Sequence, residues 1–225
     1  MAKKFATSYT RQALYEKCAF QYKCRFILKL PEEERYASQR GTLLHSKAEH
    51  FILGDITGVP KELEVYSEEL ITLREGLMTG TLSVEVEKDL AVTRGWGPTT
   101  YDDWNNVWIR AKADVVIDEG DSVTVIDHKT GMMYDSHKDQ ADIYSILAFC
   151  HYPKAKEVSV EMWYYDNKDL FLSSSMTKKQ LPKAKKLLKG RIDKAEKDKV
   201  FKPTPGDYCR YCSFASSKGG PCKKY

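Results

Sequence analysis

Apolar and polar positions in the first 80 residues follow the spacing of amphipathic helices, with an apolar side chain every three to four residues. Thr7 or Ser8 is placed to cap the first of these helices. Gly54 and Gly80 follow the last apolar positions of the second and third, where glycine commonly ends a helix. The pattern predicts three helices, over residues 7–30, 38–53 and 62–79.

The apolar period changes to two residues after Gly80. LSVEVEKDLAV, residues 82–92, alternates as a half-buried strand does. VWIRAKADVVID and VTVIDHK flank the turn-like EGDS and predict a β-hairpin over 107–129. This order predicts an α/β fold, a central mixed sheet flanked by helices, in a single domain over residues 1–225. After the hairpin we expect a helix, a strand and a lysine-rich helix, over 138–150, 157–165 and 178–199.

Composition narrows the class of protein. The net charge of +4 over 225 residues excludes a polycation, so a nucleic-acid surface would have to come from local clusters of Lys and Arg. No apolar run is long enough to cross a membrane, and the N-terminal MAKKFATSYT lacks the core of a signal peptide. We therefore expect a cytoplasmic protein whose six cysteines are reduced or bound to a metal.

Two charged residues, Asp127 and Lys129, end the second hairpin strand, where a buried β-branched run normally excludes charge. A two-residue turn at Glu119-Gly120 would place Asp127 opposite Lys112. Asp114 would then lie diagonal to Asp127 on the same face of the sheet, whereas a turn of odd length would put it on the other face. The opposite face would pack the core with Val115, Ile117 and Ile126.

Two carboxylates this close repel each other, and a cation between them relieves the repulsion. Carboxylate oxygens suit a hard divalent ion, such as Mg²⁺ or Mn²⁺. Lys129 beside such an ion would orient a water molecule or stabilise charge on a phosphate. The alternative is structural: a salt-bridged strand end in which Lys129 neutralises Asp127.

Further residues at helical spacing favour the functional alternative. Gly41, His45 and Glu49 follow one another at four-residue steps, and Gln140 and Tyr144 do the same. The ordered set Gly-x3-His-x3-Glu, Asp, Asp-x-Lys-Thr-Gly, Gln-x3-Tyr resembles the PD-(D/E)xK nucleases of the RecB family. It is closest to the CRISPR-associated RecB-like exonucleases and their phage relatives, and the resemblance spans residues 8–222.

The resemblance implies a restriction-endonuclease-like core and a role for each site residue. Members of this family often carry an acid on the strand before the hairpin, and Glu85 or Glu87 is placed to supply it. The implied metal ligands are His45, Asp114, Asp127 and the backbone carbonyl of His128. The implied catalytic residues are Lys129, Asp127 and Asp114, with Gln140 and Tyr144 along the DNA path.

The resemblance also implies an activity: a metal-dependent exonuclease that hydrolyses phosphodiester bonds at DNA ends with Mg²⁺ or Mn²⁺. Such enzymes act in recombination, repair or phage DNA processing. The implied setting is the cytoplasm of a bacterial, archaeal or phage-infected cell, with recombination or CRISPR-adaptation proteins as partners and with oligomers in some members. The alternative is a non-catalytic DNA-binding subunit, or a structural iron–sulfur or zinc subunit, of a recombination or adaptation complex.

The cysteines predict a second metal centre. Cys209 and Cys212 form a Cys-x2-Cys pair in the loop-rich tail, and Cys222 follows after two glycines. Cys18 lies where iron–sulfur members of the resembled family carry an N-terminal cysteine. The resemblance thus implies a four-iron cluster on these four cysteines that joins residues 1–30 to 200–225, and zinc would accept the same ligands. Cys24 and Cys150 are expected to be buried thiols.

Two features keep alternative interpretations. The lysine-rich helix over 178–199 fits a solvated face or a wall that contacts DNA phosphates. Trp96, Trp104 and Trp108 fit stacking on the bases of a single strand, or capping of a hydrophobic edge.

Overall fold

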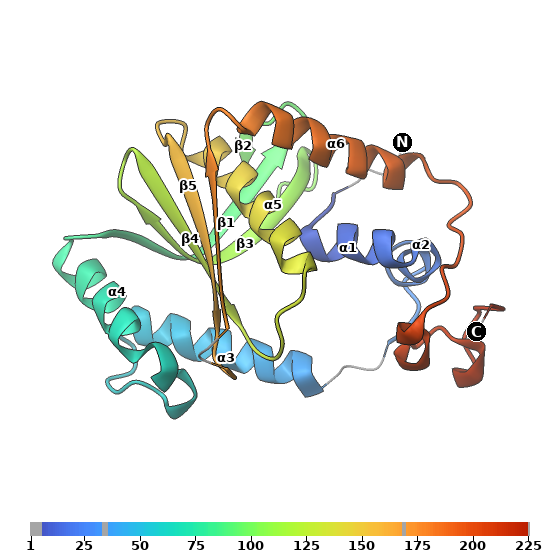
Figure 1. Ribbon diagram of the computed structural model, residues 1–225, viewed down its shortest axis with the longest axis horizontal. Coiled ribbons are helices and arrows are strands. Elements are labelled where there is room, and N and C mark those ends of the chain that lie inside the picture. Colours follow the sequence, from blue (N-terminus) through green and yellow to red (C-terminus); the bar gives the residue numbers. More distant parts are fainter. Residues whose placement is uncertain (1–5, 33–35, 168–169, 225) are drawn as a thin grey trace.

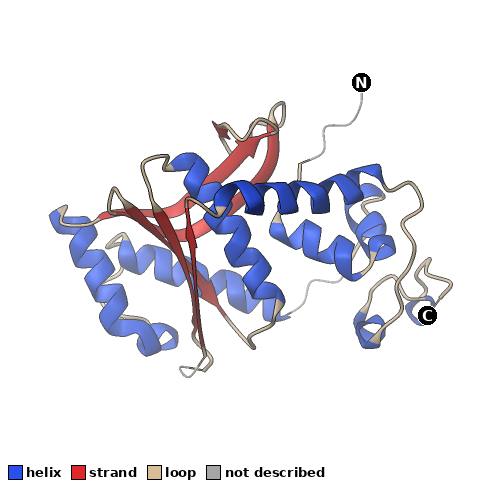
Figure 2. Cartoon of the chain, turned by 45° about the horizontal axis from the view of Figure 1, so that its top comes forward, coloured by secondary structure: helices blue, strands red, loops and turns tan. Residues whose placement is uncertain are grey.

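The computed structural model describes residues 6–32, 36–167 and 170–224. Its centre is a six-stranded sheet in the order β2-β1-β3-β4-β5-β6, with helices on both faces (Figures 1 and 2). β4 and β5 are parallel, and the other neighbouring strands of this sheet are antiparallel. This mixed sheet flanked by helices confirms the predicted α/β class. The strands are β1 (Ser83–Thr93), β2 (Pro98–Thr99), β3 (Val107–Asp118), β4 (Ser122–Lys129), β5 (Glu157–Tyr164) and β6 (Phe171–Thr177).

The predicted helix over 7–30 is not continuous. Ser8 caps the helix as expected, accepting a hydrogen bond from the Arg11 backbone N–H, but the helix stops at Cys18, whose backbone is extended with φ of −158°. The chain then turns into two short segments, so one predicted helix becomes three. The N-terminal segments are α1 (Tyr9–Lys17), α2 (Ala19–Tyr22) and the π-helical η1 (Lys23–Ile27).

The other predicted helices are present with shifted ends. Gly80 ends α4 in the left-handed conformation with φ of 70°, as its position in the sequence suggested. The start of the predicted 62–79 helix is a 3-10 segment. The remaining helical elements are α3 (Tyr36–Ile52), η2 (Lys61–Tyr66), α4 (Ser67–Thr79), α5 (Ser136–His151), α6 (Leu181–Lys197), η3 (Asp207–Tyr211) and η4 (Ser216–Lys218).

The hairpin turn lies one residue later than predicted. Val116 pairs with Val125, and the Glu119 N–H donates to the Ser122 carbonyl, so the two loop residues are Gly120 and Asp121. Gly120 has φ of 84°, and a tight hairpin of this kind favours glycine at its first loop residue. The predicted pairing of Asp127 with Lys112 is therefore wrong by two residues, while the even loop length was right.

Strands β2 and β6 were not predicted. The sequence of β6, FLSSSMT, is rich in serine, and only its second and sixth residues are buried. An edge strand needs few apolar side chains because one of its sides has no neighbour. The antiparallel register with β5 runs from Glu157 opposite Thr177 to Trp163 opposite Phe171.

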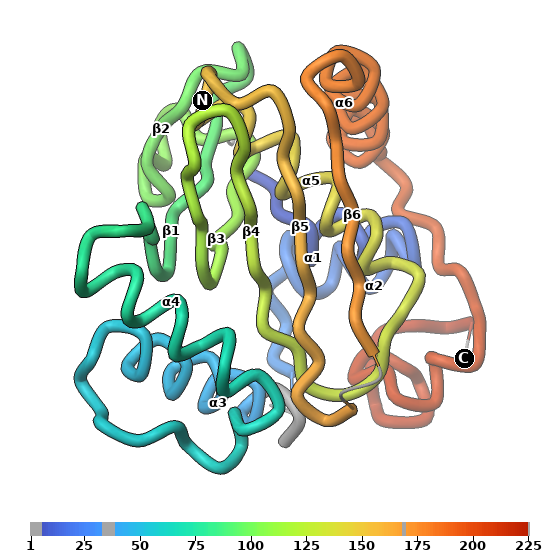
Figure 3. Tube along the Cα trace, turned by 60° about the vertical axis from the view of Figure 1, so that its left-hand side comes forward, coloured from blue at the N-terminus to red at the C-terminus, as the bar shows by residue number. Residues whose placement is uncertain are grey.

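Two hydrophobic layers cover the sheet. One layer packs α5 and α6 against the face that carries Val116 and Val125. The other packs α3 and α4 against the face with Val115 and Ile126, and Ile117 lies at its margin, as the alternation predicted. Figures 1 and 3 show α3 and α4 grouped together, on the other side of the sheet from α5 and α6. The site described next lies where the hairpin strands meet α3 and α5.

Within the residues that the structure describes, no helix is long and apolar enough to cross a membrane.

Candidate active site

Asp114 and Asp127 lie on the two strands of the hairpin. The register pairs Val115 with Ile126, and its next step places the two aspartates across from each other. Both side chains are buried, with exposed fractions of 7% for Asp114 and 3% for Asp127. The His128 backbone N–H donates to Asp114 Oδ2 at 2.6 Å, so β4 itself orients the Asp114 carboxylate. Two buried carboxylates in this position need nearby positive charge.

His45 reaches the carboxylates from α3. Its Nδ1 lies 2.8 Å from Asp114 Oδ1. Burial lowers the pKa of His45, but the hydrogen bond and charge of Asp114 outweigh burial, so the pKa of His45 is raised. Burial works against the charge of Asp114 as well, and its hydrogen bond with His45 lowers the pKa of Asp114 below the ordinary value. One turn earlier, Gly41 faces the end of β4, and a Cβ there would be in ordinary van der Waals contact with Thr130 Oγ1 at 3.6 Å.

Lys129, Gln140 and Tyr144 surround Asp127. The Lys129 ammonium lies 2.5 Å from Asp127 Oδ2 and donates to Gln140 Oε1 at 2.9 Å. Gln140 Nε2 donates to Asp127 Oδ1 at 3.0 Å, and the Tyr144 hydroxyl lies 2.7 Å from the same oxygen. Burial and the charge of Asp127 raise the pKa of Tyr144 well above its ordinary value, so this hydroxyl stays a donor. The Gln-x3-Tyr spacing on α5 thus supplies two neutral donors to one carboxylate oxygen.

These side chains open into one cavity of about 680 Å³. Two of its acids, Glu49 and Glu87, add to the negative charge of the aspartates, and Lys112 joins Lys129 as the second lysine. The four carboxylates outnumber the two lysines, so a phosphate would be repelled unless a cation entered with it. The lining residues are Thr10, Gly41, Thr42, His45, Ser46, Glu49, Glu87, Lys112, Asp114, Asp127, Lys129, Gln140 and Tyr144.

The structure distinguishes between the two candidate acids of β1. Val86 pairs with Val115 and Lys88 with Ala113, so Glu87 lies across from Asp114. Glu87 has φ of 52°, a strained conformation for a residue other than glycine, and its carboxylate lies 3.3 Å from Lys112. Burial and the charge of Asp114 raise the pKa of Glu87.

Glu85 instead pairs with Lys88 and accepts a hydrogen bond from Tyr152, and it does not line the cavity. The alternating pattern of the strand made both glutamates candidates for the site. Only the register between β1 and β3 shows that Glu87, and not Glu85, lies next to Asp114.

The His128 side chain faces away from this cavity. Its ring is buried, and its Nδ1 lies 3.0 Å from the Tyr165 hydroxyl. Burial lowers the pKa of His128, which keeps the imidazole neutral. The predicted contribution of His128 is its backbone carbonyl, and that role stays a prediction.

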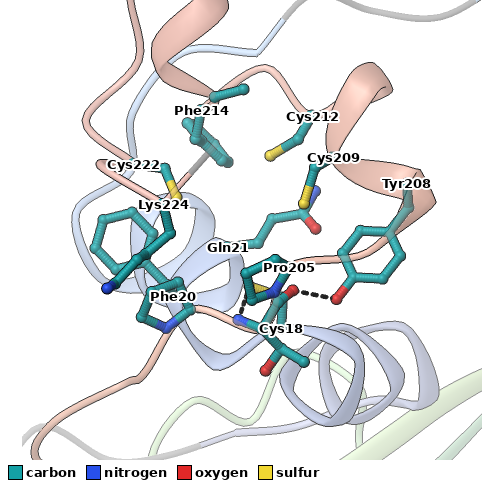
Figure 4. A pocket seen from close by; sticks show the side chains of 13 residues that line it. Cys18, Phe20, Gln21, Pro205, Tyr208, Cys209, Cys212, Phe214, Cys222 and Lys224 are labelled. Atoms are coloured by element: carbon teal, nitrogen blue, oxygen red, sulfur yellow. Dashed lines mark hydrogen bonds between the residues drawn. The ribbon is translucent and has the colours of Figure 1, made fainter.

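Four cysteines from the two ends of the described chain line a second, smaller cavity. Cys18 follows α1, while Cys209, Cys212 and Cys222 lie in the tail, which Figure 1 shows beside α2. In Figure 4 the three tail cysteines extend toward the space next to Cys18 and Gln21. The Thr204 N–H donates to Cys18 Sγ at 3.5 Å and the Gly206 N–H to Cys209 Sγ at 3.4 Å. Backbone donors of this kind favour thiolate ligands.

Of the two remaining cysteines, Cys24 is buried as expected, whereas Cys150 is only half-buried. Burial, with a contribution from the neighbouring cysteines, raises the pKa of Cys24 to about 11. Burial also raises the pKa of Cys150, which packs on the α5 side of the sheet.

Within the described residues, no group of three or more His, Cys, Asp or Glu side chains is arranged so that it could hold a metal ion. A metal at either site therefore requires side-chain rotation.

Comparison with known proteins identifies the family. A family model described as the PD-(D/E)XK nuclease superfamily matches residues 6–217, so the chain belongs to this superfamily. The predicted superfamily is confirmed, and it supports a nuclease role. The finer RecB and CRISPR-associated assignment stays a prediction. A comparison with curated protein sequences gave no significant match.

The chain is similar to three solved structures, and the first of them shares its fold. A candidate exonuclease from Eubacterium rectale is 14% identical, with a TM-score of 0.52 over 93% of this chain and 88% of that chain. The protein SSO0001 is 18% identical, with a TM-score of 0.44 over 99% of this chain and 88% of that chain. The alkaline exonuclease LHK-Exo from Laribacter hongkongensis is 12% identical, with a TM-score of 0.42 over 87% of this chain and 90% of that chain.

Proposed function

We propose that this chain is a divalent-metal-dependent deoxyribonuclease that removes nucleotides from DNA ends, and that it belongs to the RecB-like exonucleases within the superfamily. The observation that supports the proposal is the single cavity shared by His45, Asp114, Asp127 and Lys129. The proposed role is in recombination, repair or phage DNA processing, and the resemblance to CRISPR-associated and phage nucleases supports it.

The residues fit Mg²⁺ or Mn²⁺. Asp127 Oδ2 is buried, and its partner within the described residues is the Lys129 ammonium at 2.5 Å, which a metal ion would displace as the side chains rotate toward it. Asp114 adds a second carboxylate and His45 a nitrogen, a donor set typical of Mn²⁺ and acceptable to Mg²⁺. These three residues would hold the ion, with the His128 carbonyl as a further ligand. The ion would bind the scissile phosphate and lower the pKa of a coordinated water.

The chain's own residues position the reacting groups. Gln140 and Tyr144 hold Asp127 Oδ1 in place, and the His128 N–H and His45 hold Asp114. Gln140 Oε1 also holds the Lys129 ammonium at the cavity wall. From there Lys129 orients the attacking water or stabilises negative charge that develops on the phosphate. Glu87 and Glu49 keep the rest of the cavity negative, which favours cation entry.

The test is cleavage of end-labelled linear and circular DNA with and without Mn²⁺. Asp127→Ala should reduce cleavage to background, because it removes a charged ligand. Lys129→Ala should lower kcat by about 10²–10³-fold while metal binding persists. Asp121→Ala, at the exposed hairpin tip, is the matched control and should cleave normally.

Full hydrolysis by Asp127→Ala in protein free of contaminating nuclease would show that the site is wrong. DNA binding by wild-type protein without cleavage would favour the non-catalytic alternative.

We further propose that Cys18, Cys209, Cys212 and Cys222 bind an iron–sulfur cluster that joins residues 1–30 to 200–225, within one nuclease domain. The four thiols around one cavity and the N–H donors to two sulfurs support this proposal. The cavity volume of about 20 Å³ is room for about one water molecule, so a cluster requires the side chains to rotate outward, whereas zinc would need less space. Iron, sulfide and zinc analysis of protein purified without oxygen decides between them.

A further inference from the structure

The catalytic cavity continues into a neighbouring cavity of about 190 Å³. Thr10, Lys112, Gln140 and Tyr144 line both. The second cavity lies between the start of α1, β3 and α5, and Tyr101 and Arg110 form its far wall. A polymer whose scissile group lies at Asp114 and Asp127 therefore has a built path along β3.

Arg110, Lys112 and Asp114 mark this path on β3. Alternate residues of a strand project from one face, at steps of about 6.6 Å, so Arg110 lies about 13 Å from Asp114 along the strand. Two cations thus follow the catalytic carboxylates at regular spacing. Their positive charge suits the phosphate backbone of a nucleic acid, and their spacing corresponds to a strand of a few nucleotides that leads away from the carboxylates.

Two aromatic rings pack against the Arg110 guanidinium at the end of the path. Its guanidinium carbon lies 4.1 Å from the ring centroids of both Tyr101 and Trp104, and its Nη1 donates to the Tyr101 carbonyl at 3.1 Å. We call Tyr101, Trp104 and Arg110 the Arg110 stack. Trp104 is 55% exposed despite this contact.

The three neighbouring tryptophans divide into two groups. Trp108 is 1% exposed, and Trp96 packs edge-on against it with ring centroids 5.1 Å apart, so both cap the edge of the core. Trp104 takes no part in this packing. Trp104 lines neither cavity, and it adjoins the second cavity through its contact with Arg110. An exposed aromatic ring next to a cation is the combination on which bases of a single strand stack.

The turn that holds Trp104 is well anchored. Asp103 accepts hydrogen bonds from Thr99 Oγ1 at 2.7 Å and from Asn106 Nδ2 at 2.9 Å, and its carbonyl accepts from the Val107 N–H at 2.8 Å. Trp104 is therefore presented by a preorganised turn, which reduces the entropy lost when a ligand stacks on it.

We propose that the Arg110 stack is a base-binding subsite for single-stranded DNA. One base stacks on the exposed surface of Trp104, while Lys112 and Arg110 contact the backbone that runs from the catalytic cavity. The strand is single because a base must leave its duplex neighbours before it can stack on a side chain. This proposal rests on the proposed nuclease function for the position of the scissile phosphate.

The test is binding of a labelled oligothymidylate to the full chain, measured by fluorescence anisotropy with Ca²⁺ in place of Mg²⁺ or Mn²⁺, so that a divalent cation is present at the carboxylates while cleavage is suppressed. Trp104→Ala should weaken binding about tenfold, and Trp104→Phe should retain most of the affinity. The matched control is Phe171→Ala, an exposed aromatic on β6, at the opposite edge of the sheet from β2 and outside the Arg110 stack. An abasic nucleotide scanned along the oligonucleotide should weaken wild-type binding at one position by about the factor seen for Trp104→Ala. The same abasic oligonucleotide should cause little further loss in Trp104→Ala.

Unchanged binding by Trp104→Ala, an equal loss in Phe171→Ala, or no binding by wild-type protein would each overturn the proposal. So would an abasic position that weakens Trp104→Ala as much as wild type, because the base would then not contact this ring. The nuclease proposal is scored separately. If wild-type protein shows the stacking effect but cleaves no DNA with Mn²⁺, the nuclease proposal is wrong and the subsite proposal stands. If the protein cleaves DNA but binds it independently of Trp104, the nuclease proposal stands and the subsite proposal is wrong.

Discussion

The two oxygens of Asp127 have different partners in the cavity that we propose to be catalytic. Oδ1 has two neutral donors from α5, Gln140 and Tyr144. Oδ2 faces the Lys129 ammonium at 2.5 Å. One oxygen thus fixes the carboxylate, while the other already has a cationic partner, so a metal ion at Oδ2 would have to share this oxygen with Lys129 or displace it.

Tyr144→Phe tests this division of roles at the level of single atoms. Loss of the hydroxyl removes a hydrogen bond to a buried charge, which should lower the free energy of unfolding by about 1–3 kcal/mol. Cleavage should fall as well, because Asp127 loses part of its fixed orientation. Tyr152→Phe is the matched control, since Tyr152 donates to Glu85 outside the cavity. Urea denaturation and Mn²⁺-dependent kcat report the two effects. A loss of kcat that is equal in both variants would contradict the assignment.

At the scale of elements, the sequence predicted the helix ends that depend on interactions within a single turn. Ser8 and Gly80 marked real helix ends because a cap and a left-handed residue act within one turn. The break at Cys18 had no such signal, and it follows from packing of the N-terminal segments against the tail. The exact turn residue depended on the positive φ of Gly120, which the sequence offered to either of two loop positions. Serine-rich β6 became a strand only because β5 supplied its partner.

Arg191 ties three helices together and provides a pH test. It contacts Glu16 of α1 at 2.6 Å and Asp139 of α5 at 2.9 Å. Burial works to raise the pKa of Glu16, but hydrogen bonds from Arg191 and Gln12 outweigh it, and the pKa is lowered from 4.5. A lowered carboxyl pKa gives stability that is present above the unfolded value and lost as the pH falls through the folded value.

Glu16→Gln should therefore lower the free energy of unfolding at neutral pH by about 0.5 kcal/mol, a small effect because the pair is about one-third exposed. The difference from wild type should shrink as the pH falls through the lowered folded pKa of Glu16, and it should vanish once Glu16 is protonated in both states. Urea denaturation over a pH series from neutral to acid measures it. Glu62→Gln serves as the control, because its surface pair with Lys47 joins no helix of this group. A Glu16→Gln deficit that persists in acid would show that the loss is not electrostatic.

At the scale of the molecule, residues far apart in the sequence meet at two places. The catalytic cavity collects α1, α3, β1, β3, β4 and α5, and the order of motifs led to its main residues. Lys112, Glu87 and Thr10 could not be chosen from the sequence, because their positions depend on strand register and on how α1 packs. The cysteine cavity brings Cys18 next to a tail about 190 residues later, and a metal bound across it would close a long loop of the chain.

If a metal holds the two ends of the chain together, its loss should act on stability before activity. Cys212→Ser removes one of four ligands, and we expect a loss comparable to that of a native cross-link, about 2–5 kcal/mol. For a chain of this size the melting temperature would fall by roughly 5–15 °C. Cys150→Ala is the control, because this thiol lies outside the cavity. Thermal melting, bound iron and zinc, and cleavage per folded molecule are the measurements. A structural centre lowers the first two and leaves the third unchanged, since the catalytic carboxylates lie in a different cavity. A Cys212→Ser protein that melts like wild type but no longer cleaves would place the cysteines in DNA handling instead.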